Sequence, residues 1–388
     1  MMKNVYIIGS KGIPAKYGGF ETFVENLTKL QKSSDIKYFV SCLNGSKSGT
    51  FQYNGATCFN ISVPNIGPGK AILYDILSLR WAIQHIEQNN VQDAVVYILA
   101  CRVGPFIEPY VKKLHQLGAT YYLNPDGHEW LRAKWSKPVR AYWRKSEKKM
   151  VGAADLVICD SINIERYIRK NYDRNNLRTC FIPYGATVRN EIFKAKENQL
   201  EWFRRCGLHF DNYYLIVGRF VPENNYEVMI REFMKSNSTK PLVIVTNVEK
   251  NKFYKKLQKA TNFDDDPRIK FVGTVYDSEL LALIREHAFA YIHGHSVGGT
   301  NPSLLEALAL TRLNLLFDVG FNHEVGEDGA KYWSKKSGSL SNLINQVDNW
   351  TDLTINSIGN MAKQRIISEY NWDKIVKSYE EVFLGEQS

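Results

Sequence analysis

Two glycine-rich segments follow strand-like apolar runs in this sequence of 388 residues. The first segment, at 9–19, ends in the pair Gly18-Gly19, and the second contains the pair Gly298-Gly299. Small residues after a strand let backbone N–H groups approach an anion, and a following helix adds its positive dipole end. Both segments therefore predict phosphate binding. The first lacks the G-x-G-x-x-G spacing, which disfavours a dehydrogenase, and a tight turn without a ligand is the alternative.

Charged side chains accompany these glycines in the second half of the chain. Arg219 comes directly after the apolar run 213–217, and a guanidinium at a strand end is suited to bidentate contact with a diphosphate. Glu223 follows closely, and we predict that it is catalytic together with Arg219. Glu306 lies in the first turns of a predicted helix, where its carboxylate is placed to accept hydrogen bonds from sugar hydroxyls. The alternatives are a surface loop for Arg219 and a favourable helix-dipole interaction for Glu306.

In the first half, Asp126 follows the run 120–123. Doubly wound folds bind ligands at this edge, beyond the carboxyl ends of the strands. The Asp126 carboxylate is therefore predicted to take a proton from an acceptor hydroxyl or to stabilise an oxocarbenium ion. His128 and Glu129 are weaker candidates beside it. An ordinary Asp-Gly turn is the alternative.

Metal binding is not predicted. The run Asp264-Asp265-Asp266 is a carboxylate cluster, but it precedes Pro267 in a polar stretch without a second group of ligands. Arg219 and helix N-termini are sufficient to neutralise a diphosphate. The six cysteines are widely spaced without a C-x-x-C pair, so we expect reduced thiols and no structural zinc.

The order of apolar runs predicts an α/β protein. Strand-like and helical segments alternate, as in parallel sheets flanked by helices, and the pattern restarts after residue 200. We predict two Rossmann-like doubly wound domains that face a central cleft, at 1–190 and 191–365, with a C-terminal helix within 366–388 that crosses back to the first domain. Predicted strands are 5–8, 38–42, 94–100, 120–123, 156–159, 179–182, 213–217, 242–246, 269–272, 290–293 and 314–317; predicted helices in the first half are 19–31, 71–89, 107–117, 138–151 and 161–170.

Positive charge is concentrated in the first half. Residues 1–190 hold 26 Lys and Arg against 14 Asp and Glu, whereas the remainder holds 24 against 26. Residues 132–149 carry eight basic side chains, one acid and three large aromatics. Such a helix is suited to an anionic membrane surface; an ordinary solvated helix and a nucleic-acid contact are the alternatives, and no RNA-binding signature is present. The residues predicted to contact the acceptor or membrane are Tyr17, His128, Lys134, Trp135, Lys137, Arg140, Trp143 and Arg144.

The N-terminal apolar run is too short for a secretory signal, and no later run has the length of a membrane span. We therefore expect a cytoplasmic protein.

Several motifs together resemble a known enzyme class. The Gly18-Gly19 loop, Gly-Arg-Phe-x-Pro-Glu at 218–223 and Asn-Pro-Ser-Leu-Leu-Glu-Ala-Leu at 301–308 resemble the GT-B glycosyltransferases of family 4. The loop 9–22, the segment 124–130 and His-Gly-His-Ser-Val-Gly-Gly-Thr-Asn-Pro at 293–302 resemble, more narrowly, the streptococcal-type β-1,4-rhamnosyltransferases of capsule and cell-wall polysaccharide synthesis. The resemblance covers nearly the whole chain.

The resemblance implies a retaining, metal-independent enzyme. It would transfer L-rhamnose from dTDP-rhamnose to an undecaprenyl-diphosphate-linked saccharide, with GlcNAc or Glc as the acceptor sugar, at the inner face of the membrane and without nucleic acid. One alternative is a related glycosyltransferase that uses a different nucleotide sugar or a soluble acceptor. The other is a protein that binds a nucleotide or nucleic acid without catalysis. The donor-binding residues implied are Gly18, Gly19, Arg219, Val272, Gly273, Val275, Gly298, Gly299, Thr300, Asn301 and Glu306.

Two positions depart from the family pattern. Many members have two glutamates eight positions apart, and here the first of these positions holds Gly298 while the second is Glu306. A lysine that commonly follows the Pro-Glu pair is Asn224 here. The first change removes a usual contact with the sugar hydroxyls, and the second removes a cation near the diphosphate. A changed donor sugar is consistent with both.

Overall fold

The computed structural model describes residues 2–15, 18–44, 49–132, 134–172, 177–188, 195–248 and 250–386. It divides into two compact domains. The first comprises Met1–Leu131, Trp135–Tyr184 and Trp372–Ser388, and the second comprises Arg132–Lys134 and Gly185–Asn371. No helix among the described residues is long and apolar enough to cross a membrane.

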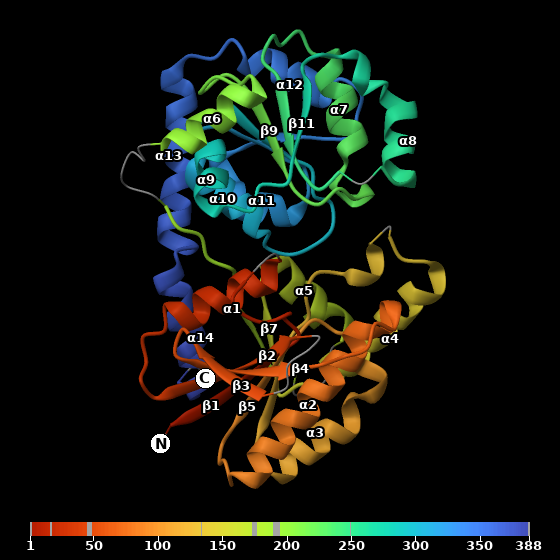
Figure 1. Ribbon diagram of the computed structural model, residues 1–388, viewed down its shortest axis with the longest axis vertical. Coiled ribbons are helices and arrows are strands. Elements are labelled where there is room, and N and C mark those ends of the chain that lie inside the picture. Colours follow the sequence, from red (N-terminus) through yellow and green to blue (C-terminus); the bar gives the residue numbers. More distant parts are fainter. Residues whose placement is uncertain are drawn as a thin grey trace. The chain divides into compact units, whose positions relative to one another are not determined.

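The first domain contains a sheet of eight strands in the order β3-β4-β2-β1-β5-β6-β7-β8 (Figure 1). All neighbouring strands pair in parallel except β3, which is antiparallel to β4. The chain moves outward from β1 in one direction to β2 and in the other to β5, so the strand order reverses between β1 and β5. The strands are β1 Lys3–Ile8, β2 Ile36–Leu43, β3 Gly49–Tyr53, β4 Ala56–Ile61, β5 Val95–Leu99, β6 Thr120–Asn124, β7 Leu156–Cys159 and β8 Thr179–Phe181.

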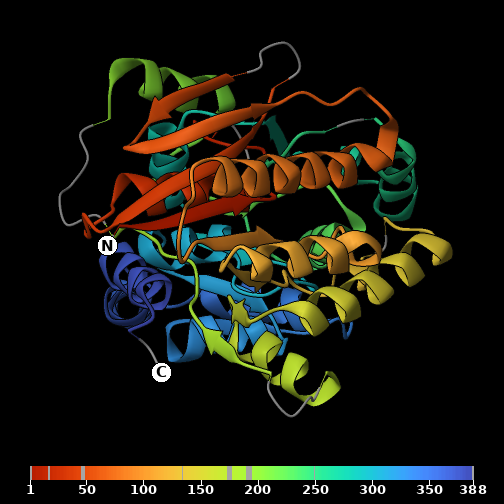
Figure 2. The same cartoon turned by 90° about the horizontal axis from the view of Figure 1, so that it is seen from below.

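Helices cover both faces of this sheet, which explains why its central strands are apolar on both sides. The helices α2, α3 and α4 lie side by side along one face (Figure 2). On the other face, Tyr379 of α14 packs against Phe23 of α1, with 5.0 Å between the ring centroids. The Tyr379 hydroxyl lies 3.3 Å from the hydroxyl of Tyr97. The helices are α1 Gly19–Lys29, α2 Lys70–Gln88, α3 Ile107–Gln116, α4 Lys137–Ala153, α5 Ile162–Asn171 and α14 Trp372–Leu384, with short 3₁₀ helices η1 Gly67–Gly69, η2 Gly104–Phe106 and η3 Glu129–Leu131.

The second domain contains a parallel sheet of six strands in the order β11-β10-β9-β12-β13-β14. Its strand order reverses between β9 and β12. The strands are β9 Tyr214–Val217, β10 Leu242–Val245, β11 Ile269–Gly273, β12 Ala290–His293, β13 Asn314–Phe317 and β14 Lys331–Trp333. The helices are α6 Glu197–Cys206, α7 Tyr226–Lys235, α8 Lys252–Thr261, α9 Ser278–Glu286, α10 Pro302–Leu310, α11 Gly320–Gly326, α12 Ser339–Val347 and α13 Asp352–Glu369, with 3₁₀ helices η4 Pro222–Asn224, η5 Phe263–Asp265 and η6 Glu327–Gly329.

Alternate residues of these strands enter two separate cores. Tyr214 and Ile216 of β9 pack with side chains of α7, α8 and α12, whereas Leu215 packs with side chains of α6, α9 and α10. Successive side chains of a strand point to opposite faces, so each strand contributes to both cores. The prediction of two doubly wound parallel-sheet domains is confirmed.

Three strands were not expected from the sequence. The strands β3 and β4 form a hairpin whose turn is Asn54-Gly55, with φ of 46° and 75°. This dipeptide is the strongest short-range signal for a hairpin, because both turn residues must adopt positive φ. The strand β14 has only three residues, too few to show a periodic pattern.

Candidate functional site

The carboxyl ends of β9 and β12 lie next to each other in the second domain, at the point where the strand order reverses. Open α/β sheets bind their ligands at such a point. Gly218 and Arg219 follow β9, and Gly294 and His295 follow β12. Arg219 is exposed. The structure thus brings the predicted Arg219 to the expected edge of the sheet.

Hydrogen bonds fix the two loops at this edge. The Tyr226 hydroxyl donates to the carbonyl of Gly218 at 2.9 Å, and Asn225 Nδ2 donates to the carbonyl of Gly294 at 2.7 Å. Ser296 donates to the carbonyl of Glu223 from its backbone N–H at 3.1 Å and from its hydroxyl at 2.7 Å. The loops are therefore joined to each other and to the start of α7. A site built in this way is organised before a ligand arrives.

Glu223 is the most unusual side chain in this region. It is only 7% exposed, and neither carboxylate oxygen has a hydrogen-bond partner among the described residues. Buried polar groups are normally paired, and leaving one unpaired costs about 1–3 kcal/mol or more. The hydroxyl of Thr246, directly after β10, is also buried without a partner in the described chain. A polar ligand at this sheet edge would satisfy both groups.

The second glycine segment leads into α10. Asn301 caps this helix, because its Oδ1 accepts from the N–H groups of Ser303 and Leu304 at 2.9 and 3.4 Å. The predicted role of Asn301 as a donor-binding residue thus competes with its role as an N-cap. The N–H groups of Gly298 and Gly299 have no acceptor among the described residues, and Thr300 beside them is buried. These glycine N–H groups are the donors that an anion would use.

One carboxylate oxygen of Glu306 is paired with another side chain of the same domain. Its Oε2 forms an ion pair with Nη2 of Arg285 at 2.8 Å. The Arg285 side chain is 4% exposed and that of Glu306 is 40% exposed, so Glu306 neutralises a buried cation with one oxygen and offers the other to solvent. Its Oε1 has no hydrogen-bond partner among the described residues.

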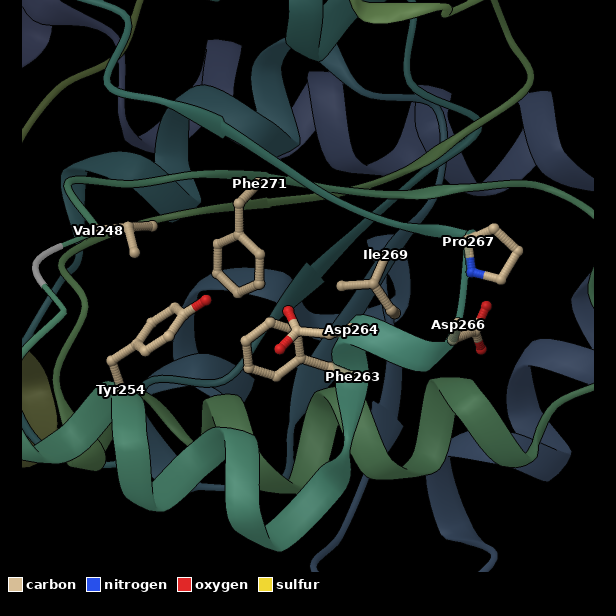
Figure 3. A pocket seen from close by; sticks show the side chains of 8 residues that line it. All are labelled: Val248, Tyr254, Phe263, Asp264, Asp266, Pro267, Ile269 and Phe271. Atoms are coloured by element: carbon tan, nitrogen blue, oxygen red, sulfur yellow. The ribbon is translucent and has the colours of Figure 1, made fainter.

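The edge strand β11 ends with Val272 and Gly273, and Val275 lies two residues beyond it. The two valine side chains pack partly buried against the core of the α6 and α9 face. A pocket of about 310 Å³ adjoins the other side of β11, between this strand and α8, and none of the predicted site residues lines it (Figure 3). It is lined by Val248, Tyr254, Phe263, Asp264, Asp266, Pro267, Ile269 and Phe271.

The aspartate run lies at this pocket. Asp266 is paired with Arg268 at 2.7 Å, which lowers its pKa, and Asp264 accepts a hydrogen bond from Gln258. No group of three or more potential metal ligands is found among the described residues.

Carboxylates of α1 accept hydrogen bonds from the first glycine loop. Glu21 of α1 accepts from the N–H of Lys11 at 2.7 Å, and Glu25 accepts from the N–H of Ala15 at 2.8 Å. A Cβ at Gly18, whose φ is 130°, would lie 1.9 Å from Oε2 of Glu21. The N–H groups of Lys11 and Ala15 are thus bonded to carboxylates of α1, whereas anion binding by Gly18 and Gly19 stays a prediction. Gly19 is the first residue of α1; Tyr17 lies outside the described residues.

Asp126 is the second residue after β6 and has a φ of 58°. Its N–H donates to Oδ1 of Asn124, and its own Oδ1 accepts from the N–H of Gly127, both at 2.8 Å. The carboxylate thus takes part in the Asp-Gly turn and stays half-buried at the carboxyl edge of the sheet. His128 packs against Tyr167 with ring centroids 4.2 Å apart and the rings tilted by 58°, and burial lowers the pKa of His128.

Arg102 is a charged residue at the same edge that the sequence did not reveal. Its Nη1 donates to the carbonyls of Gly9 and Leu99, at the ends of β1 and β5, and to Oδ2 of Asp75 at 3.1 Å. Asp75 is fully buried, and desolvation raises its pKa to about 6 despite the Arg102 charge. The contacts with Gly9 and Asp75 come from residues 27 or more positions away, so no local pattern could indicate them. The pair fixes the edge where the strand order of the first domain reverses.

The basic segment forms α4, whose inner face is buried through Ser146, Glu147, Met150 and Val151. The outer face carries exposed basic side chains, including Lys137, Arg144 and Lys145, and Lys134 before the helix is also exposed. Arg140 is half-buried. The half-buried Trp135 and Trp143 pack on each other at 6.3 Å between ring centroids. Lys137 and Arg144 thus lie on the exposed side of α4, whereas the two tryptophans are engaged with the protein.

Two family models cover most of the chain. Residues 2–187 match a model described as "Domain of unknown function (DUF1972)", and residues 201–378 match the model for glycosyl transferases group 1. The chain has the GT-B fold, and its second domain matches the glycosyltransferases of group 1. No curated protein sequence matches the chain.

Solved structures share the fold along the whole chain. Sucrose-phosphate synthase from Thermosynechococcus elongatus aligns with a TM-score of 0.77 and 15% identity, over 100% of this chain and 99% of that chain. A glycosyltransferase from Rickettsia africae aligns with a TM-score of 0.72 and 13% identity, over 100% and 99%. HepE from Anabaena, solved in complex with UDP, aligns with a TM-score of 0.71 and 14% identity, over 99% and 100%. At these identities the likeness establishes the fold.

Proposed function

We propose that this protein is a glycosyltransferase that transfers L-rhamnose from dTDP-rhamnose to a lipid-diphosphate-linked saccharide, with retention of anomeric configuration. The observation that carries the proposal is the group of unsatisfied polar side chains at the carboxyl ends of β9, β10 and β12. Glu223 and Thr246 are buried without partners in the described chain, and Arg219 and the N–H groups of Gly298 and Gly299 adjoin the same sheet edge. A cation, free N–H donors and a free carboxylate together suit a diphosphate joined to a sugar.

The residues divide the chemistry between them. During transfer, the bond between the sugar carbon and the diphosphate oxygen breaks, and a bond to the acceptor hydroxyl oxygen forms on the same face. The acceptor proton passes to the departing diphosphate oxygen. Arg219 stabilises the charge that develops on the diphosphate, and Glu223 accepts hydrogen bonds from the sugar hydroxyls. In the first domain, Asp126 is the carboxylate proposed to orient the acceptor hydroxyl.

The donor sugar is inferred from the sequence motifs. The segments 9–22, 124–130 and 293–302 resemble rhamnosyltransferases, and Gly298 stands where many relatives have a glutamate. Rhamnose is a 6-deoxy sugar and offers one hydroxyl fewer than glucose, so the loss of one carboxylate is consistent with this donor. A UDP-sugar is the second candidate, because HepE was solved with UDP-glucose.

The exposed face of α4 supports the proposed acceptor and location. Its outer face carries exposed basic side chains, which would hold the enzyme at an anionic leaflet where a lipid-linked saccharide is found. We further propose that transfer needs no metal ion, since Arg219 and the glycine N–H groups supply the positive charge.

A transfer assay tests the proposal. The purified chain is incubated with undecaprenyl-diphosphate-linked GlcNAc or Glc and with dTDP-rhamnose, UDP-glucose or UDP-GlcNAc, with and without excess EDTA, and the lipid product is measured by mass spectrometry. We expect a mass increase of one deoxyhexose with dTDP-rhamnose, unchanged by EDTA. Transfer only from a UDP-sugar would replace the proposed donor, and loss of activity that Mg²⁺ restores would contradict metal independence.

A further inference from the structure

Two histidines lie at the carboxyl end of β12, His293 as its last residue and His295 two residues later. None of the roles proposed above involves them. The imidazoles of His293 and His295 are stacked with ring centroids 4.3 Å apart and an interplanar angle of 12°. His293 is fully buried, and its Nδ1 lies 3.3 Å from the hydroxyl of Tyr291. His295 is half-buried. The inner ring thus supports the outer ring at the sheet edge.

The outer imidazole is held in one place. A Cβ at Gly218 would lie 3.2 Å from Cε1 and 3.6 Å from Nε2 of His295, so this edge of the ring lies over the backbone that leads to Arg219. The carbonyl of His295 accepts from Asn322 Nδ2 at 3.3 Å, and the next residue is bonded to Glu223 through its backbone N–H and hydroxyl. The position of His295 is therefore determined by contacts on both sides.

The ring nitrogens of His295 have no hydrogen-bond partner in the described part of the chain. Nδ1 is buried without a hydrogen-bond partner among the described residues, whereas Nε2 reaches the surface and likewise bonds to none of them. Burial, together with His293 and Arg219, holds the pKa of His295 well below its usual value, so the ring is neutral and carries one proton. Orphaned acceptors are tolerated better than orphaned donors, which places the proton on Nε2.

We infer that Nε2 of His295 donates a hydrogen bond to the β-phosphate of the bound nucleotide sugar, beside the guanidinium of Arg219. This inference rests on the proposed function and adds a donor-binding residue to it. A neutral N–H donor assists the departing diphosphate, since a hydrogen bond to a charged oxygen is among the stronger ones in proteins. His293 is then a positioning residue that keeps the imidazole at its angle.

Calorimetric titration of the full chain tests the inference. Parent, His295→Ala and His295→Gln are titrated with dTDP and with dTMP at pH 8, where the terminal phosphates stay fully ionised, and with UDP in parallel. His323→Ala is the matched control, because His323 is a solvent-accessible histidine of the same domain that is paired with Asp318 at 2.7 Å. Thermal unfolding of each variant confirms that it is folded.

The predicted result separates the β-phosphate from the rest of the nucleotide. His295→Ala should weaken dTDP binding by about tenfold or more while changing dTMP binding by less than about threefold, since dTMP lacks the β-phosphate. His295→Gln, which retains an N–H donor, should recover most of the affinity, and His323→Ala should bind as the parent does.

Three results would overturn the inference. Unchanged dTDP affinity in His295→Ala would show that His295 does not contact the nucleotide. Equal losses of affinity for dTDP and dTMP would show that His295 contacts a part of the nucleotide other than the β-phosphate. A folded His295→Gln that is as weak as His295→Ala would show that the ring shape matters and not the donor. In all three cases the parent still binds dTDP, and the proposed function stands. A parent that binds neither dTDP nor UDP would contradict both.

Discussion

Nη2 of Arg285 lies 2.8 Å from Oε2 of Glu306, and this ion pair joins α9 to the first turns of α10. The arginine is buried and also donates to the hydroxyl of Ser303 at 3.1 Å. One carboxylate oxygen of Glu306, Oε2, therefore has a structural partner. The other, Oε1, has no hydrogen-bond partner among the described residues. This arrangement limits how Glu306 can contact a donor sugar, because rotation of the carboxylate would leave a buried cation unpaired.

Glu306→Gln is expected to weaken binding of dTDP-rhamnose more than binding of dTDP. The amide oxygen can still accept from Arg285, so the fold is preserved, whereas the outward oxygen is replaced by an NH₂ group or loses its charge. Calorimetry with both ligands measures the difference. Glu327→Gln is the control, since it alters a similar ion pair with Arg365 at 2.8 Å in the same domain. Equal affinities of Glu306→Gln and the parent for dTDP-rhamnose would leave Glu306 a purely structural residue.

Arg219→Ala is expected to lower kcat by about a hundredfold or more, because a fixed cation beside a developing charge contributes several kcal/mol to the transition state. Arg231→Ala serves as the control, since Arg231 is a partly exposed arginine of the same domain paired with Glu227 at 2.6 Å. Steady-state kinetics of both variants measure kcat, which should fall in Arg219→Ala and stay at the parental value in Arg231→Ala. Near-normal turnover of Arg219→Ala would exclude it from the mechanism.

Asp75 should make stability depend on pH. Its pKa is about 6 in the folded protein and 3.8 for the free side chain. Between these values the folded state binds more protons than the unfolded state, so the contribution of Asp75 to the free energy of unfolding falls as the pH rises from about 4 to about 6. From pH 4.5 to 6.5, the stability of the parent relative to Asp75→Asn should fall by about 2 kcal/mol.

Urea unfolding at the two pH values measures this double difference, in which the titration of all other groups cancels. A relative stability that rises with pH would mean that the pKa of Asp75 is lowered in the folded state and that the Arg102 charge outweighs desolvation.

The outer face of α4 is expected to bind anionic membranes. Replacing Lys137, Lys145, Lys148 and Lys149, all exposed, with Gln should weaken binding to vesicles containing phosphatidylglycerol by about tenfold or more, since each basic residue near such a surface contributes about 1 kcal/mol. Replacing four exposed lysines of α8 is the matched control, with the same change in net charge; these are Lys252, Lys255, Lys256 and Lys259.

Co-sedimentation with the vesicles measures both quadruple variants, and dTDP affinity should stay at the parental value in each. Equal losses of vesicle binding in the two variants would show that net charge governs binding and not α4.

The sequence predicted the fold class and the second-domain strand ends well, because long apolar runs and the Gly-Arg and Gly-Gly segments are local features. It did not predict that Glu21 and Glu25 accept hydrogen bonds from the first glycine loop. Their carboxylates lie one turn apart on α1 and reach back ten residues to the loop, and no periodicity indicates such a contact. Glycines explained by packing and glycines that approach an anion look alike in a sequence.

The remaining site features depend on contacts between distant segments. Arg285 and Glu306 meet across two helices, and Arg102 collects partners from β1, β5 and α2. His295 lay within a motif that the sequence singled out, but its lack of a partner appears only once burial is known. By contrast, the missed hairpin at Asn54-Gly55 had a clear local signal.

The central claim is that the diphosphate of the donor binds at the carboxyl ends of β9 and β12. A crystal structure of the full chain with dTDP tests it most directly. We expect the diphosphate oxygens within hydrogen-bonding distance of the Arg219 guanidinium and the N–H groups of Gly298 and Gly299. A diphosphate bound instead at the first glycine loop, or in the pocket beside β11, would contradict the account.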